Sequence, residues 1–193
     1  MIEFTKNYPG DYLHCGQMDL PWEQIHQDLK TVADEQTKNW SIIDNTTYQD
    51  NASVLQNEYK KYGYNQHNTR SWKTTNFDPK INFEWENLIV KALPLDNAVV
   101  TIHRQDPGQV LPWHIDRFFM HKRLYPNDER PIWRFLVFLE EWQNGHILQV
   151  GNSVLHHWHQ GDTVVWTPGT WHLAANVGLN KKWTANITGF LKV

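Results

Sequence analysis

Three residues in the C-terminal half have the types and spacing of a metal site. His114 and Asp116 stand two residues apart in PGQVLPWHIDRFF, and His172 follows much later in PGTWHLAANVG. Residues i and i+2 of a strand point to the same face, so the imidazole of His114 and the carboxylate of Asp116 are expected to converge. Two histidines and one carboxylate form the facial triad that binds non-haem Fe(II) and leaves positions open for a 2-oxo acid and O2. We predict that all three are catalytic metal ligands, with ligand atoms within about 4 Å of one another.

A cation follows the last of these ligands. Lys182 lies ten residues beyond His172, at the start of the predicted last strand, where Thr184 shares its face. An ammonium group beside a hydroxyl group is suited to binding a carboxylate. Arg134 lies within the apolar segment PIWRFLVFLE, where a charged side chain is costly unless it is paired, so a buried pair with Asp or Glu is one interpretation of it.

The elements that must position these residues change in type near residue 97. Before it, apolar residues recur at steps of three or four, which predicts helices over 21–33 and 79–93, the second capped by Asp78. The polar stretch 41–75 is expected to hold one weak helix around 48–61 and otherwise ordered loop.

After residue 97 the sequence predicts short strands bounded by Gly, Asn or Pro. They cover 97–105, 109–116, 131–140, 146–150, 153–159, 163–167, 170–176 and 182–191. Strands at this spacing indicate an antiparallel sandwich or barrel, and because many are apolar on both faces, the N-terminal helices are expected to cover one sheet. We therefore predict an α+β jelly roll. Residues 1–193 form a single domain, in which a helical and loop part (1–96) supports the core and the substrate pocket, and 97–191 is the catalytic core.

The C-terminal half resembles a known family. It is similar to the double-stranded β-helix core of Fe(II)/2-oxoglutarate-dependent dioxygenases, and most similar to their aspartyl/asparaginyl β-hydroxylase-like branch. The similarity covers about residues 97–191. It rests on Pro107-Gly108, Trp113-His114-Ile115-Asp116, Arg134, Glu140-Glu141, Asn144-Gly145-His146, Trp158, Gly161-Asp162, Trp166, His172, Asn176 and Lys182.

This resemblance implies a cofactor, a cosubstrate and a reaction. His114, Asp116 and His172 would bind Fe(II), Lys182 and Thr184 would bind the distal carboxylate of 2-oxoglutarate, and Arg134 would face 2-oxoglutarate or the substrate. The reaction implied is hydroxylation of an amino acid or a peptidyl Asp/Asn-type substrate, in which O2 is consumed and succinate and CO2 are released. Lys182 stands where an arginine is commoner in this branch, so the contact is expected to be a point charge. Some members lack the acidic ligand, whereas Asp116 is present here, which argues against a halogenase.

Composition excludes other classes of function. Among 193 residues the net charge is −3 and there is no basic block, so nucleic acid is not an expected partner. The sequence shows no signal-like segment and no apolar run that would span a membrane, and a single cysteine, Cys15, excludes an intramolecular disulfide. We expect a soluble, cytoplasmic enzyme with a small-molecule or peptide substrate and no membrane partner.

Two alternatives use the same predicted fold. A cupin-like metal-dependent isomerase or epimerase is expected to have more histidines around the metal and no dedicated cation after the last ligand. A non-enzymatic sugar-binding jelly roll would use the 11 Trp residues, exposed on one flat face.

Further aromatic and basic residues are given structural interpretations. Trp113, Trp166 and Trp171 are taken as core residues, with room for one at the pocket mouth, and His156, His157 and His159 as surface residues. His103 and Arg104 alternate, so at most one of them points inward.

Overall fold

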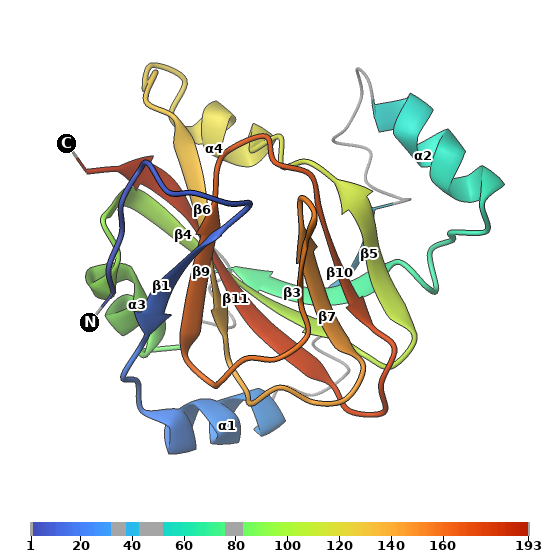
Figure 1. The fold of residues 1–193 in the computed structure, drawn as a ribbon, viewed down its shortest axis with the longest axis horizontal. Coiled ribbons are helices and arrows are strands. Elements are labelled where there is room, and N and C mark those ends of the chain that lie inside the picture. Colours follow the sequence, from blue (N-terminus) through green and yellow to red (C-terminus); the bar gives the residue numbers. More distant parts are fainter. Residues whose placement is uncertain (1, 32–37, 43–51, 76–82, 193) are drawn as a thin grey trace.

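Two antiparallel sheets make up most of the molecule (Figure 1). The computed structural model describes residues 2–31, 38–42, 52–75 and 83–192. The strands are β1 (Leu13–Gln17), β2 (Lys38–Ser41), β3 (Arg70–Thr75), β4 (Leu95–Gln105), β5 (Gln109–His114), β6 (Ile132–Phe138), β7 (His146–Val150), β8 (Ser153–Leu155), β9 (Asp162–Trp166), β10 (His172–Asn176) and β11 (Lys182–Leu191). The helices are α1 (Trp22–Thr31), α2 (Ala52–Lys61), α3 (Glu86–Ala92) and α4 (Phe119–Leu124).

The strand order is that of a double-stranded β-helix. The large sheet runs β1-β9-β6-β11-β4-β3-β2 and the small sheet runs β5-β10-β7-β8. From β4 to β11 the chain crosses repeatedly between the two sheets, so residues far apart in sequence face one another across the interior. The predicted α+β jelly roll is confirmed.

Residues of β11 alternate between an apolar outer face and a more polar inner face. Trp183, Ala185 and Ile187 pack into a cluster with Ile25 of α1 and Ile89 of α3, so these helices cover the outer face as expected. Burying a side chain of this size contributes roughly 1.5–3 kcal/mol. The alternate residues of β11, including Lys182 and Thr184, point toward the small sheet.

A second apolar cluster fills one half of the space between the sheets. Leu136, Phe138 and Val164 from the large sheet meet Leu148 and Val150 from the small sheet. The other half, lined by β3, β4 and β11, carries polar side chains, and this half holds the candidate site.

Several predicted elements differ from those observed. The helix predicted over 79–93 is limited to Glu86–Ala92 among the described residues, and Asp78 lies outside them. The strand predicted over 153–159 ends at Leu155. The N-terminal half also contributes strands β1, β2 and β3, where only helix and loop were expected, because these strands are stabilised by the sheet they join.

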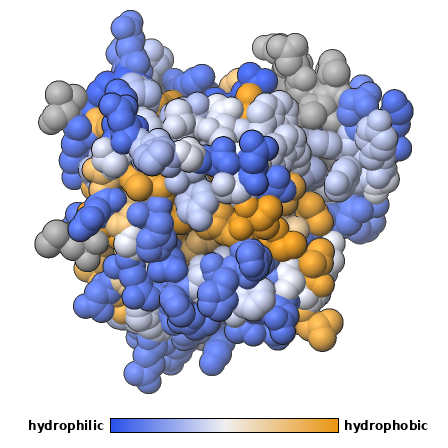
Figure 2. All heavy atoms as spheres, viewed as in Figure 1, coloured by the Kyte–Doolittle hydropathy of each residue, from blue (hydrophilic) through white to orange (hydrophobic). Residues whose placement is uncertain are grey.

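Within the described ranges, no helix is both long and apolar enough to cross a membrane. Figure 2 shows apolar residues in a band across the middle of the face seen in Figure 1, with hydrophilic residues around it.

Candidate metal centre

Two histidines meet on neighbouring strands of the small sheet. His114 is the last residue of β5 and His172 the first of β10, they are paired in register, and their ring centroids are 4.3 Å apart. The Nδ1 atom of His114 is 2.7 Å from the carbonyl oxygen of Pro112, and that of His172 is 2.9 Å from the carbonyl oxygen of Thr170. A carbonyl can only accept, so Nδ1 donates in both rings and Nε2 is left with the lone pair that a metal binds.

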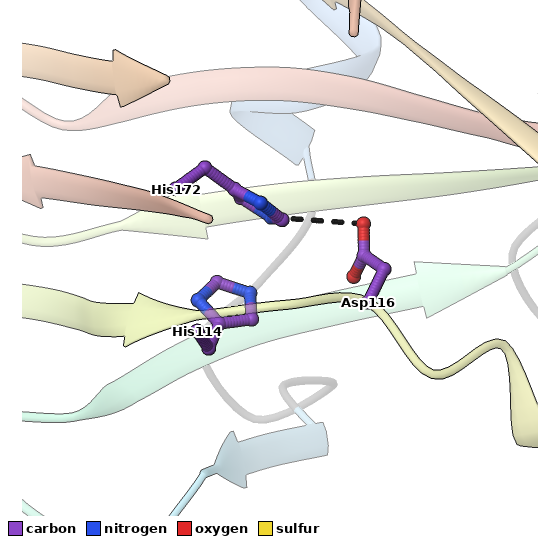
Figure 3. A group of neighbouring side chains, drawn as sticks. All are labelled: His114, Asp116 and His172. Carbon is purple, nitrogen blue, oxygen red and sulfur yellow. Dashed lines mark ion pairs between the residues drawn. The ribbon is translucent and has the colours of Figure 1, made fainter. Parts of the chain in front are cut away.

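The carboxylate of Asp116 completes the group (Figure 3). Asp116 lies beyond the end of β5, so the turn of the chain after His114, and not a shared strand face, brings it to the histidines. Its Oδ2 atom is 3.6 Å from Nε2 of His172. One ligand atom from each of the three residues lies within 4.8 Å of the others, a wider arrangement than the roughly 4 Å expected for octahedral ligands.

The protonation states of these groups suit a divalent cation. Burial lowers the pKa of His114 to about 3 and also lowers the pKa of His172, so both imidazoles are neutral at pH 7. Burial alone would raise the pKa of Asp116, but Arg134, followed by the two imidazoles, holds it below its ordinary value. The Oδ2 atom of Asp116 is buried without a hydrogen-bond partner among the described residues. Two neutral imidazoles and one ionised carboxylate are a donor set that fits Fe(II).

Arg134 holds the aspartate in place. Its Nη1 atom lies 2.5 Å from Oδ1 of Asp116, and its Nε donates to Oγ1 of Thr188 at 3.1 Å. The guanidinium carbon lies 5.2 Å from the ring centre of Phe118, whose φ of 54° is unusual for a bulky residue. The charged group in this apolar strand is therefore paired, and its partner is the carboxylate of the candidate metal ligand.

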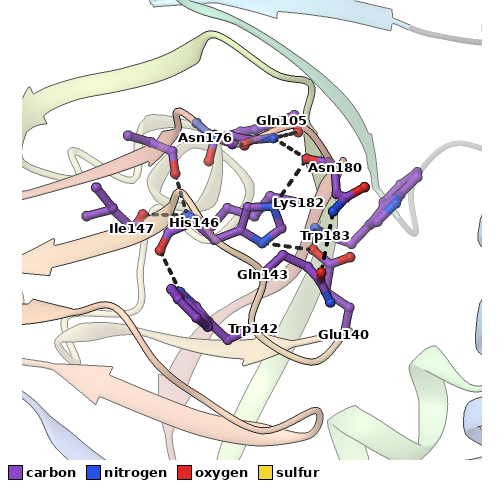
Figure 4. Close-up of polar contacts among 12 residues, drawn as sticks. Gln105, Glu140, Trp142, Gln143, His146, Ile147, Asn176, Asn180, Lys182 and Trp183 are labelled. Atoms are coloured by element: carbon purple, nitrogen blue, oxygen red, sulfur yellow. Dashed lines mark hydrogen bonds and ion pairs between the residues drawn. The ribbon is translucent and has the colours of Figure 1, made fainter.

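Lys182 lies on the inner face of β11, as the predicted strand register requires. Its side chain is buried, and Nζ donates to the carbonyl oxygens of Ile147 at 2.5 Å and Ala175 at 3.4 Å (Figure 4). Burial lowers the pKa of Lys182 to about 7, against an opposing effect of Glu140. Thr184 is also buried, whereas Lys181 is exposed.

A polar network surrounds this lysine. Glu140 accepts a hydrogen bond from the backbone N–H of Trp183 at 2.7 Å, and burial raises the pKa of its carboxyl to about 7. The Nδ1 atom of His146 is 3.5 Å from the same carboxylate, and its Nε2 donates to the carbonyl of Asn180 at 3.2 Å. Several hydrogen bonds thus surround Lys182 (Figure 4).

A third basic group on the inner face was not anticipated from sequence. Lys73 of β3 pairs in register with His103 of β4, which pairs in turn with Thr184 of β11. Burial is the main cause that lowers the pKa of Lys73 to about 7; Arg134 lowers it further and Asp116 opposes this. Lys73 lies in a stretch interpreted as loop, although Trp and Thr on both sides of it are residues favoured in strands.

Of the adjacent residues His103 and Arg104, it is His103 that points toward the interior. His103 is buried, and its pKa is well below the ordinary value because of burial and then of Lys73, Arg134, His114 and Lys182. Arg104 faces outward between Trp72 and Trp183.

Aromatic residues surround the histidines. Trp166 is buried, with its ring centre 4.8 Å from that of His172. Trp113 and Trp171 stack at 6.2 Å with an interplanar angle of 14°, and Trp171 is 41% exposed, so this pair forms an accessible rim. The hydroxyl of Tyr59 in α2 donates to the carbonyl of Trp113 and ties that helix to β5.

The remaining histidine cluster is placed on the surface. His156, His157 and His159 are exposed, and Nδ1 of His159 is 3.2 Å from Glu141. Within the described part of the chain, the only group of three or more potential metal-binding side chains is His114, Asp116 and His172.

Comparison with known proteins finds only distant structural similarity. Neither a protein-family model nor a curated protein sequence matches this chain. A prolyl-4-hydroxylase from Pseudomonas putida matches 89% of this chain and 99% of its own, with a TM-score of 0.49 and 16% identity. A Cupin 2 conserved barrel domain protein from Salinispora arenicola matches 62% of this chain and 75% of its own, at a TM-score of 0.36 and 10% identity. An uncharacterized conserved protein with a double-stranded β-helix domain from Klebsiella pneumoniae matches 50% of this chain and 70% of its own, at a TM-score of 0.35 and 18% identity. These structural neighbours include cupin and double-stranded β-helix proteins, and similarity this distant says nothing about the activity of this chain.

Proposed function

We propose that this protein is an Fe(II)- and 2-oxoglutarate-dependent dioxygenase that hydroxylates an amino acid or a peptidyl Asp/Asn-type substrate, with release of succinate and CO2. The observation that carries the proposal is the convergence of two neutral imidazoles and one ionised carboxylate, from His114, His172 and Asp116, within 4.8 Å. Three protein ligands leave coordination positions for a chelating 2-oxo acid and O2.

The protein's own residues hold and orient the metal. Bound Fe(II) would supply the activation of O2 and the oxidation of the substrate, coupled to decarboxylation of 2-oxoglutarate. The carbonyls of Pro112 and Thr170 fix the two imidazoles in the tautomer that presents Nε2. Arg134 orients Asp116 and keeps it ionised. Such supporting contacts are worth about 10- to 100-fold in metal affinity at sites of this kind.

Lys182 and Thr184 are proposed to bind the distal carboxylate of 2-oxoglutarate. The ammonium of Lys182 is buried between the sheets and donates to the backbone carbonyls of Ile147 and Ala175. A dianionic ligand would favour the charged form of a lysine whose pKa burial has lowered. Thr184 shares the same inner face two residues along and offers a hydroxyl donor.

The distribution of tryptophan favours an enzyme over a sugar-binding module. Stacking on sugar rings needs exposed indoles on one face. Of the tryptophans whose side chains the structure describes, Trp171 is exposed and the others are buried or half-buried.

The test is substrate-stimulated turnover of 2-oxoglutarate. The protein is reconstituted with Fe(II) and ascorbate, supplied with amino acids and short peptides, and assayed for succinate and hydroxylated product. We expect turnover that rises with one class of substrate and disappears in His172→Ala. Absence of metal binding by wild-type protein, measured independently by titration with Mn(II), would refute the proposal.

A further inference from the structure

Lys73 lies on the inner face of the large sheet and Arg134 is paired with the metal ligand Asp116, and we infer that these two cations together bind a carboxylate of the primary substrate, which is therefore an acid and not its amide. The inference rests on the proposed function and narrows the substrate that it leaves open between Asp-type and Asn-type groups. It concerns Lys73, a residue from the N-terminal half that neither the sequence motif nor the metal site includes.

The strand register fixes the direction of Lys73. Lys73 on β3 pairs with His103 on β4, and His103 pairs with Thr184 on β11. The next row, formed by Trp72, Arg104 and Trp183, packs on the outer face of the sheet, where the ring centroids of the two tryptophans are 5.5 Å apart. Alternation therefore places Lys73 on the inner face, in the row that crosses the polar half of the barrel.

Strand β3, which carries Lys73, contacts β5, which ends at the metal ligand His114. Lys73 interacts electrostatically with Arg134 and Asp116, and Arg134 forms a 2.5 Å ion pair with Asp116. When Asp116 binds a divalent metal ion, much of its negative charge is balanced by that ion. The two cationic side chains then attract an additional anion, and because both are largely buried, salt screens this attraction weakly.

Exposure separates the place of the substrate from the place of the cosubstrate. The side chain of Arg134 is 24% exposed, whereas Lys182 is 2% exposed. A ligand that must enter and leave with the substrate can reach Arg134 from solvent. The proposed partners of 2-oxoglutarate, the metal for one end and Lys182 for the other, already account for both of its carboxylates. The carboxylate bound by Lys73 and Arg134 therefore belongs to the substrate.

The chemistry distinguishes an acid from an amide. A carboxylate accepts charge-assisted hydrogen bonds from an ammonium and a guanidinium group, and these are roughly twice as strong as neutral ones. A carboxamide is neutral and presents an NH2 group that cannot pair with either cation. For one such charged contact we expect a preference for the acid of about 10- to 100-fold.

The experiment measures binding without turnover. Protein loaded with Mn(II) and saturated with 2-oxoglutarate under anaerobic conditions is titrated with L-aspartate and L-asparagine, with L-glutamate and L-glutamine, and with the N-acetyl amides of all four. Binding near the metal is read from paramagnetic broadening of the ligand's proton resonances. We expect at least one acid to bind about 10-fold or more tightly than its amide. Lys73→Gln should abolish that preference and leave the affinity for 2-oxoglutarate within about twofold of wild type.

Two matched variants make the result specific. Lys73→Arg keeps the charge and should retain the preference, which also separates loss of charge from loss of fold. Lys60→Gln, at an exposed position of α2, should behave as wild type.

Four results would overturn the inference. They are equal affinities of wild-type protein for acid and amide, binding of none of the pairs, an unchanged preference in Lys73→Gln, and a loss of 2-oxoglutarate affinity in Lys73→Gln as large as in a Lys182 variant. Failure of the proposed function is detected separately, because it appears as missing Mn(II) or 2-oxoglutarate binding before any acid is added.

Discussion

Replacement of Lys182 by Met tests the proposed binding of 2-oxoglutarate most directly. Methionine keeps most of the side-chain volume beside Trp158, so packing is largely retained while the ammonium is lost. Truncating one partner of a buried charge pair typically costs about 2–5 kcal/mol. The dissociation constant for 2-oxoglutarate should therefore rise by at least about 30-fold. Lys181→Met is the matched control, because its side chain is exposed one residue away.

The pKa of Lys182 adds a signature that a merely structural lysine would lack. Burial lowers this pKa to about 7, so about half of the lysine is neutral at pH 7, and a bound carboxylate would restore the charged form. Binding of 2-oxoglutarate at pH 7 should take up about half a proton. Above pH 7 the affinity should fall, by up to about tenfold per pH unit, since the carboxylates of the ligand no longer titrate there.

Glu140 provides a second control on the same titration. Its proximity raises the pKa of Lys182 against the effect of burial, and its own pKa of about 7 lies in the same range. In Glu140→Gln the pKa of Lys182 should fall, so the loss of affinity should begin at a lower pH. Anaerobic calorimetry of the Mn(II) protein in two buffers of different ionisation enthalpy measures both affinity and proton uptake. Equal titrations of the Lys182 and Lys181 variants, or no proton uptake by wild type, would refute the assignment.

Three further predictions concern the metal centre. His114→Ala and His172→Ala should each weaken Mn(II) binding by at least about 100-fold while near-ultraviolet circular dichroism stays native, and tight binding by either variant would contradict the ligand assignment. Arg134→Gln should lower the free energy of unfolding by about 3 kcal/mol at pH 7 and, because Asp116 is then more easily protonated, should lose Mn(II) at a higher pH than wild type; an unchanged pH profile would contradict this role. In metal-free protein, buried His103, His114 and His172 have pKa values below that of unfolded histidine, so the unfolded state takes up protons first. The free energy of unfolding should therefore fall between pH 6.5 and 5 by up to about 1.4 kcal/mol per histidine per pH unit, and equal urea midpoints at pH 7 and 5 would count against it.

The C-terminal strands were predictable because their local patterns agree with their surroundings. β11 was predicted over 182–191 and is observed at Lys182–Leu191, with the expected inward and outward alternation. Its apolar residues face a helix-covered surface and its polar residues face the interior, so period two is visible in the sequence itself.

The N-terminal strands were not predictable in the same way. β3 is held by contacts with residues distant in sequence, such as the packing of Trp72 on Trp183 and Arg104. Local composition around it is polar, and nothing in the segment alone indicates which sheet it would join. The inward position of Lys73 depends on that pairing, so it could not be predicted from sequence.

The three candidate metal ligands were predicted from spacing, although the expectation that His114 and Asp116 share a strand face was wrong, because β5 ends at His114. His114 ends β5, and Asp116 lies in the segment that follows, next to Phe118 with its left-handed backbone. The spacing alone could not distinguish a shared strand face from a turn. Both geometries bring the two side chains together, so the spacing was enough to indicate the three side chains that converge in the structure.

The interior of the barrel contains buried basic side chains that do not stabilise the ligand-free protein. One half, around Phe138 and Leu148, is apolar and supplies the core between the sheets. In the other half Lys73, His103 and Lys182 all have pKa values lowered chiefly by burial, so each is held in a place that disfavours its charged form. Such groups do not stabilise the free protein, and natural sequences keep conflicts of this kind mainly at functional sites. Under the proposed function, an anionic ligand between the sheets would favour the charged forms of the two lysines, and we therefore propose that the polar half of the barrel binds ligand and is not simply part of the core.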